Sequence, residues 1–543
     1  MNILSKSLIP FIIIFNIHLT NCQDQIPFLQ KKANTTQLIV EGNPFIILGG
    51  ELGNSSSSTV QYMQPIWPKL KAMNLNTVLV PVYWELIESE ETKFDFPLIE
   101  QIITEARNNK LKIVFLWFAS WKNSMSCYVP AWVKLNQEKF PRAKDDKLRS
   151  QEILTPFSEN NLLADLNAFE KLMNFIKDFD SKNHTVIMVQ VENEIGMLPT
   201  ARDYYPVANE LFKKDVPVDL ITYMQLNKAK LVPEFLAIWE KNGFKTSGNW
   251  EEIFGKGVHT DEIFMAWYYS KYTNKIIEAG KKIYPLPMYV NAALNRPNRA
   301  PGSGYPSAGP LPHLMDIWKA AGLSIDFLAP DIYFPDFKHW NDLYTRQGDP
   351  LFIPEHRFDN TAASKSLYAI GHYNALGFSP FSIESTDKPD DEPLGKMYNL
   401  ISQLAPIITS NQGQGKIEGV LLDKENQDTI IQMGEYEFTF RHEYTLGWSP
   451  GAKEDEWPLV SAIIIQTGEE EFYIAGTGIV VTFKPLNNDS INVGILKVDE
   501  GKFENNNWKI LRHLNGDQTH QGRHLRIPAG EYTIQRLELY TYK

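Results

Sequence analysis

Eight short apolar runs, rich in β-branched residues, recur along the chain and are separated by longer stretches, several with helical spacing. Apolar residues fill these runs almost without alternation, which predicts parallel strands covered on both faces. Eight such strands with intervening helices favour a closed (β/α)8 TIM barrel over an open sheet, and hence an α/β fold. The runs span residues 45–52, 77–84, 111–118, 185–193, 287–292, 326–333, 350–355 and 377–384.

The pattern changes near residue 410, after a Gly/Gln-rich stretch that is typical of a linker. Short strand-like runs and turns follow, which predict a C-terminal all-β sandwich domain. At the other end, an apolar stretch over residues 8–17 follows Lys6 and is too short to span a bilayer, as in a signal peptide. We therefore expect a signal peptide over 1–22, a catalytic barrel over 23–410 and a β-sandwich over 411–543.

The signal peptide predicts an exported protein, either periplasmic, extracellular or an outer-membrane lipoprotein. Cys22 stands at the expected cleavage point, where a lipid anchor is one hypothesis and ordinary cleavage is the other. Asn21 fits a lipoprotein signal poorly, because a small residue is usual before the modified cysteine. With Cys127 as the only other cysteine, a disulfide framework is excluded. No later segment is long enough to predict a membrane span.

Composition narrows the class of ligand. The net charge is −12, and no basic face that would suit a nucleic acid is evident. We find no metal-ligand spacing and no nucleotide-binding loop, so no metal and no cofactor are expected. The 13 tryptophans include residues suited to carrying sugar rings, although most of them are expected in the core. The oligomeric state is not indicated by the sequence.

Catalytic groups of a (β/α)8 barrel lie at the carboxyl ends of its strands. Two carboxylates that face each other across a pocket suit glycoside hydrolysis, because one donates a proton while the other attacks the sugar or activates water. The fourth and seventh strands face each other across the barrel and end at Glu194 and Glu355, the predicted catalytic pair. Acidic side chains end most of the runs: Glu51, Glu85, Glu192, Glu194, Asp331, Glu355 and Glu384.

The motifs ILGGELGNSSS, VPVYWELIE, VQVENEIG, MYVNA, GYPSAGP and LFIPEHRF together resemble glycoside hydrolase family 35, the β-galactosidase family. The resemblance runs from about Gln37 to the end and is closest to bacterial members with a C-terminal all-β domain. It implies a retaining double displacement, with Glu194 as acid/base and Glu355 as nucleophile. It also implies that Asn193 binds the sugar 2-hydroxyl and that Tyr333 orients the nucleophile.

The expected function is therefore an exo-acting β-galactosidase that removes terminal β-D-galactose from plant or algal oligosaccharides or polysaccharides. The chain departs from the family where it has WELIE and SWKN, which leaves the sugar open. A glucosaminide, an arabinopyranoside, or a barrel that binds glycan without cleaving it stay as alternatives. Glu192 is expected to face into the barrel. Candidate sugar contacts, each with a structural role as the alternative, are Tyr83, Glu85, Trp121, Lys122 and Asn123.

Overall fold

The computed structural model describes residues 25–486 and 491–543. The predicted signal peptide and Cys22 lie outside the described residues and stay predictions. Within the described part, Cys127 is an exposed free thiol. None of the helices described there has the length and apolar character needed to cross a bilayer.

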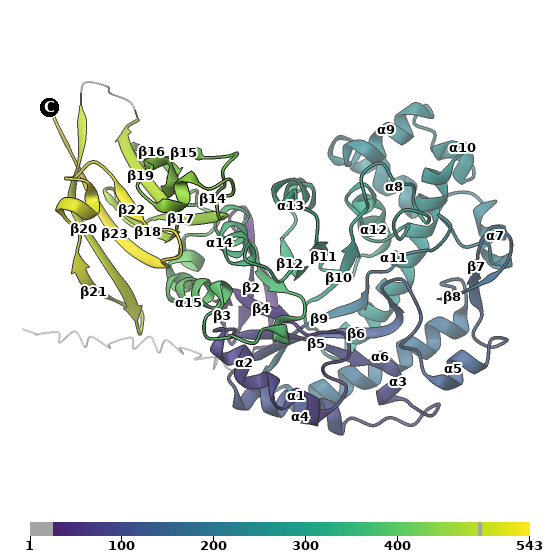
Figure 1. The fold of residues 1–543 in the computed structure, drawn as a ribbon. Coiled ribbons are helices and arrows are strands. Elements are labelled where there is room, and N and C mark those ends of the chain that lie inside the picture. Colours follow the sequence, from purple (N-terminus) through teal and green to yellow (C-terminus); the bar gives the residue numbers. More distant parts are fainter. Residues whose placement is uncertain (1–24, 487–490) are drawn as a thin grey trace, which may run out of the picture.

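Eight parallel strands close into a barrel, which confirms the predicted fold (Figure 1). Each strand pairs with the barrel strands that come before and after it in the sequence, and the last strand pairs with the first. Each strand lies inside or close to a predicted run. The last run is shorter than expected, because a left-handed residue at Ser382, with φ of 54°, ends the extended backbone and leads into a 3-10 turn. The strands are β4 (Ile47–Glu51), β5 (Thr77–Tyr83), β6 (Lys112–Lys122), β9 (Val186–Asn193), β10 (Met288–Ala293), β11 (Phe327–Ile332), β12 (Phe352–His356) and β13 (Gly377–Pro380).

Helices surround the barrel, each burying its apolar face against the strands. The Ser158 hydroxyl caps the second longest of them by accepting a hydrogen bond from the Asn161 backbone N–H. The outer helices are α2 (Ile66–Ala72), α4 (Pro97–Asn108), α6 (Glu159–Asp180), α11 (Val258–Ile283), α12 (Met315–Ala321), α13 (Phe337–Thr345), α14 (Ala362–His372) and α15 (Pro393–Asn411).

Shorter elements fill the loops at the carboxyl ends of the strands. The segment between β9 and α11 contributes four of these helices, and its sequence shows helical spacing for some of them. These elements are α1 (Val60–Met63), α3 (Trp84–Ile87), α5 (Ala131–Leu135), β7 (Arg142–Lys144), β8 (Ser150–Leu154), α7 (Pro206–Phe212), α8 (Val218–Leu226), α9 (Pro233–Lys241) and α10 (Trp250–Phe254).

A three-stranded sheet that the sequence analysis missed precedes the barrel and closes its amino-terminal end. It comprises β1 (Phe28–Lys32), β2 (Thr35–Val40) and β3 (Asn43–Phe45). Leu38 and Val40 of this sheet share one buried cluster with Ile47 and Phe352, which begin two barrel strands. The cluster fills the bottom of the barrel with apolar side chains, so the interior is a packed core rather than a channel.

The C-terminal domain is built from two antiparallel sheets that share one apolar core, as predicted for a sandwich (Figure 1). One sheet has the order β14 (Ile417–Leu422), β17 (Val460–Gln466), β18 (Glu471–Thr477), β23 (Thr533–Tyr542), β20 (Asn492–Glu504) and β21 (Asn507–His513). The other has the order β15 (Asp428–Met433), β16 (Tyr436–His442), β19 (Ile479–Pro485) and β22 (Leu525–Ile527).

The larger sheet also packs on the barrel. Ile464 points into the sandwich, whereas its neighbours Ile463 and Ile465 join the core of the barrel domain, as strand alternation requires. Helix α14 approaches β14 so closely that a Cβ at Gly371 would lie 2.9 Å from the Gly419 Cα. The sandwich therefore braces the helix that follows β12, the strand carrying Glu355.

Candidate active site

Glu194 and Glu355 meet at the carboxyl end of the barrel, although 161 positions separate them in the sequence. One carboxylate oxygen of each, together with one of Asp331, lies within 4.8 Å of the others. Only 8% of Glu194 and 3% of Glu355 is exposed to solvent. Asp331 sits directly opposite Glu355 in the β11–β12 ladder, which explains how a third acid joins the pair.

The backbone at the end of β9 is in the left-handed region on both sides of Asn193, with φ of 61° at Glu192 and 46° at Glu194. Such residues are uncommon outside glycine, and their strain is sustained only where the surroundings hold them. Here the Ser124 hydroxyl donates to the Glu194 carbonyl oxygen (2.8 Å), and the Glu194 N–H donates to Asn291 Oδ1 (3.0 Å). This kink lets the consecutive side chains of Asn193 and Glu194 both face the site.

Hydrogen bonds hold both oxygens of Glu355. The Tyr333 hydroxyl donates to Oε2 at 2.8 Å, and the Asn193 amide donates to Oε1 at 3.3 Å. Asn193 is held in turn by the Lys122 ammonium, which donates to its Oδ1 at 2.9 Å. Burial opposes the charge on Lys122, but the surrounding carboxylates, Glu355 first, raise its pKa above the ordinary value. Lys122 is thus a buried cation beside the proposed nucleophile.

Glu194 has an environment that suits an acid. Burial, followed by the negative charge of Glu355, raises its pKa from 4.5 to about 7, while the Lys122 charge and a hydrogen bond from Asn123 oppose this rise. The Asn123 amide donates to Glu194 Oε2. A carboxyl group with a pKa of about 7 is about half protonated at neutral pH, and the protonated form can give its proton to a leaving oxygen.

Glu51 and Asp331 complete the cluster. Burial, and then the charge of Glu355, raise the pKa of both carboxyl groups well above the ordinary range, which favours their neutral forms. Asp331 accepts a hydrogen bond from the Asn291 amide at 2.7 Å. Three carboxyl oxygens this close also suit a cation, but Lys122 already supplies positive charge there and lowers the pKa of both Glu194 and Asp331.

Of the five candidate sugar contacts, the structure brings Lys122 and Asn123 to the pair. Tyr83 lies on the barrel wall, where its hydroxyl is 3.0 Å from the Ser57 Oγ and its ring stacks on Tyr128 at 5.5 Å. Glu85 is not brought to the pair: its carboxylate accepts from the Lys134 ammonium at 3.4 Å in a half-exposed position on α3.

The candidate role of Trp121 as a sugar contact is wrong. Its side chain is 0% exposed and lies edge-on to Tyr269 and Tyr272 of α11, outside the barrel wall. The β6–β9 ladder shifts register between Trp117 and Lys122, so the inward-facing positions cannot be counted along the sequence. A fully enclosed indole contacts no sugar.

The expectation that Glu192 faces into the barrel is also wrong. Its carboxylate accepts a hydrogen bond from the Trp121 backbone N–H at 2.7 Å and lies against Asp165 of α6. Burial and the Asp165 charge raise the pKa of Glu192 well above the ordinary range. Glu192 therefore joins the barrel wall to its helices instead of reaching the substrate.

Glu51 and Asp331 were predicted only as strand ends, and no role was predicted for Asn291. Their position at the ends of β4, β11 and β10 was the available signal. Their roles depend on distances to Glu355 and Glu194, which a single sequence does not contain.

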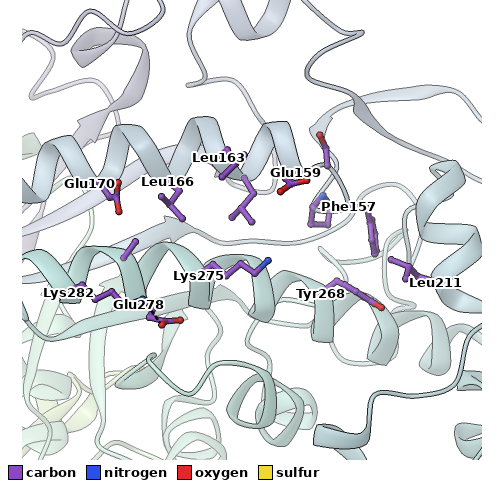
Figure 2. Close-up of a pocket in the computed structure, with 14 residues that line it drawn as sticks. Phe157, Glu159, Leu163, Leu166, Glu170, Leu211, Tyr268, Lys275, Glu278 and Lys282 are labelled. Carbon is purple, nitrogen blue, oxygen red and sulfur yellow. Dashed lines mark ion pairs between the residues drawn. The ribbon is translucent and has the colours of Figure 1, made fainter.

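A cavity of about 580 Å³ opens beside Glu194. A second hollow, of about 660 Å³, lies between α6 and α11 on the outside of the barrel and contains neither member of the pair (Figure 2). The cavity at the pair is lined by Glu194, Leu198, Ala293, Leu294, Arg296, Ser303, Gly304, Tyr305, Pro306, Asp331, Tyr333, Phe334 and Arg357.

Several solved structures resemble the chain. One is a β-galactosidase from Bacillus circulans (15% identity, TM-score 0.46), which aligns over 67% of this chain and 57% of its own. Another is the catalytic domain of a β-amylase from Paenibacillus polymyxa (14% identity, TM-score 0.45), which aligns over 65% of this chain and 97% of its own. A third is a catalytic mutant of a family 42 β-galactosidase from G. stearothermophilus (11% identity, TM-score 0.49), which aligns over 94% of this chain and 99% of its own. The chain thus spans little over half of the first structure, and likenesses this distant carry no argument about substrate.

No curated protein matches the chain significantly. Residues 394–526 match a domain of unknown function, DUF5597, which covers α15 and most of the sandwich. Residues 37–257, which include the first four barrel strands and Glu194, match Glycosyl hydrolases family 35. The predicted resemblance to glycosyl hydrolases family 35 is thereby confirmed over residues 37–257.

Proposed function

We propose that the protein is a retaining exo-glycoside hydrolase that releases terminal β-D-galactose from oligosaccharides or polysaccharides. The observation that carries this proposal is the close approach of Glu194 and Glu355, which have oxygens within 4.8 Å of each other. Retaining enzymes keep their two carboxyl groups about 5–5.5 Å apart, whereas inverting enzymes leave about 6.5–9.5 Å for a water molecule. An oxygen–oxygen approach within 4.8 Å fits the shorter, retaining spacing and supports this mechanism.

In the first step, a Glu355 oxygen attacks the anomeric carbon while the glycosidic C–O bond breaks and Glu194 gives its proton to the leaving oxygen. In the second step, Glu194 takes a proton from water, whose oxygen displaces Glu355 from the sugar. Tyr333 and Asn193 fix the attacking carboxylate through both of its oxygens. Lys122 holds Asn193 in the orientation that binds the 2-hydroxyl of the sugar.

A packed floor lies beneath the pair. Tyr289 is 0% exposed, and the charges of Glu51, Asp331 and Glu355 affect its pKa, so its ring forms the floor under these carboxyl groups. The interior below belongs to the apolar cluster that closes the barrel. The substrate therefore enters from the carboxyl end of the barrel, and exo action is proposed from the family resemblance.

Galactose is proposed from the family resemblance. Because the chain departs from the family at Glu85 and Lys122, the identity of the sugar is tested first. The experiment is hydrolysis of a panel of nitrophenyl glycosides by the wild type, Glu194→Gln and Glu355→Gln. Cleavage of the β-galactoside, lost in Glu355→Gln, supports the proposal. Cleavage of only a glucosaminide or an arabinopyranoside contradicts the sugar, and binding of galactosides without cleavage of nitrophenyl or oligosaccharide substrates contradicts the enzyme.

A further inference from the structure

The cavity beside Glu194 receives the leaving group of the proposed reaction. Glu194 protonates the glycosidic oxygen, so the aglycone has to lie against this residue. Glu194, Asp331 and Tyr333 line the cavity, whereas Glu355 does not. The cavity is therefore on the aglycone side, and its chemistry decides what galactose can be attached to.

Two arginines stand out among the residues that line this cavity. Arg357 follows directly after β12, and Arg296 lies on the loop after β10, so they come from different strands. Both side chains are exposed, and within the described residues neither forms an ion pair with an acidic side chain. Elsewhere in the barrel, arginines such as Arg107 and Arg202 are paired with aspartates.

Exposed Arg299 also lacks an ion pair among the described residues, so what distinguishes Arg296 and Arg357 is that both line the cavity beside the proposed acid. A guanidinium presents two parallel N–H donors that match the two oxygens of a carboxylate or of a sulfate ester. Half-buried Phe334 also lines the cavity and offers a ring for a sugar face. Cations, an aromatic ring and the proton donor thus surround one space.

We infer that the aglycone is an anionic sugar, recognised by Arg296 and Arg357 through a carboxylate or sulfate group. This inference rests on the proposed function, because it takes Glu194 as the acid. It narrows the substrate from any β-galactoside to galactose linked to a uronic acid or to a sulfated sugar. The overall negative charge of the protein repels polyanions, so local recognition at the cavity has to outweigh that repulsion.

The test compares matched substrates within each enzyme. A β-galactosyl glucuronate is compared with its neutral methyl ester, and a β-galactosyl 6-sulfated N-acetylglucosamine with its unsulfated form. We expect kcat/KM to favour at least one anion over its neutral partner by tenfold or more. The preference should fall below threefold in Arg296→Gln/Arg357→Gln. Arg299→Gln is the matched control, because Arg299 is exposed on the same loop but does not line the cavity.

Preference for the uronate assigns the group to a carboxylate, and preference for the sulfated substrate assigns it to a sulfate ester. Equal kcat/KM for both members of both pairs overturns the inference, even if nitrophenyl β-galactoside is cleaved and the proposed function stands. Loss of the preference in Arg299→Gln also overturns it. If the wild type cleaves no substrate, the proposed function fails. Calorimetric titration with the same four sugars then tests the inference separately. Equal affinities for the anionic and neutral member of both pairs contradict it.

Discussion

The two ends of the barrel are built from the same strands but have opposite chemistry. Strand β12 begins at Phe352 in the apolar bottom cluster and ends near Glu355 in the site, only three positions later. Strand β4 runs likewise from Ile47 to Glu51. At about 3.3 Å per residue, roughly 10 Å separates a packed hydrocarbon core from a cluster of buried carboxyl groups.

This contrast shows how the fold keeps stability apart from function. The bottom end has side chains with no charge to desolvate, whereas the top end holds carboxyl groups with raised pKa values and left-handed residues around Asn193. Substitutions at the bottom should therefore change the free energy of unfolding, and those at the top should change turnover. The predictions below test this separation.

The largest effect is expected at the top. Glu355→Gln should lower kcat by at least about 10⁴-fold, as loss of a covalent nucleophile does. Differential scanning calorimetry at pH 7 should show that the variant is folded. Without the Glu355 charge, which raises the pKa of Glu194 and Glu51, these carboxyl groups ionise more readily and can still compensate Lys122. Retained turnover in the folded variant would contradict the account.

At the bottom, Leu38→Ala should cost about 2–5 kcal/mol of unfolding free energy, because it leaves a cavity where β2 closes the barrel. Chemical denaturation measures this cost. The folded variant should keep kcat within about threefold of the wild type, since Leu38 lies at the end of the strands remote from Glu355. A loss of turnover similar to that of Glu355→Gln would mean that the two ends are not independent.

Lys122 and Lys112 provide a matched pair at the two ends of β6. Lys122→Met should lower kcat/KM by roughly 10²-fold, because removing one partner of buried charges leaves the other uncompensated. Lys112→Met breaks a partly exposed ion pair with Glu41, at 2.5 Å, and hydrogen bonds to the carbonyl oxygens of Asn183 and His184. It should leave kcat/KM unchanged, because these contacts lie at the end of β6 remote from the pair. Steady-state kinetics on both variants checks this, and equal losses would refute the comparison.

The smallest expected effect is a shift in the pH profile. With the Glu194 pKa near 7, kcat/KM for an unactivated disaccharide should fall as pH rises above about 7. The Asn123 hydrogen bond lowers this pKa, so Asn123→Ala should move the falling limb to higher pH. Profiles of both enzymes measure the shift; movement to lower pH would show that Glu194 is not the acid.

Much of this architecture was predictable because it is periodic. The eight apolar runs, the helical spacing between them and the change near residue 410 come from local patterns, and the observed strands follow them closely. The missed sheet β1–β3 has short strands with polar residues and a proline. The best signal for this sheet in the sequence was Gly42, which suits a tight hairpin turn. In the structure Glu41 and Gly42 form that turn, with φ of 51° and 75°.

The sequence predicted only those site residues that follow from the positions of the strand ends. Glu194 and Glu355 could be named because the fourth and seventh strands of a barrel face each other. Trp121 and Glu192 were misplaced because a register shift and a left-handed residue break the alternation by which inward positions are counted. The neutral state of Glu51 and Asp331 arises from burial and from neighbours distant in sequence, which no local pattern records.

The central claim is that Glu194 and Glu355 act as a retaining pair. Its most direct test is the stereochemistry of the first product, followed by proton NMR during hydrolysis of an aryl β-galactoside. The account predicts that β-galactose forms first and that the α-anomer appears only later, by mutarotation. Initial formation of α-galactose would contradict it, because the anomeric carbon would then be attacked by water directly and not by Glu355.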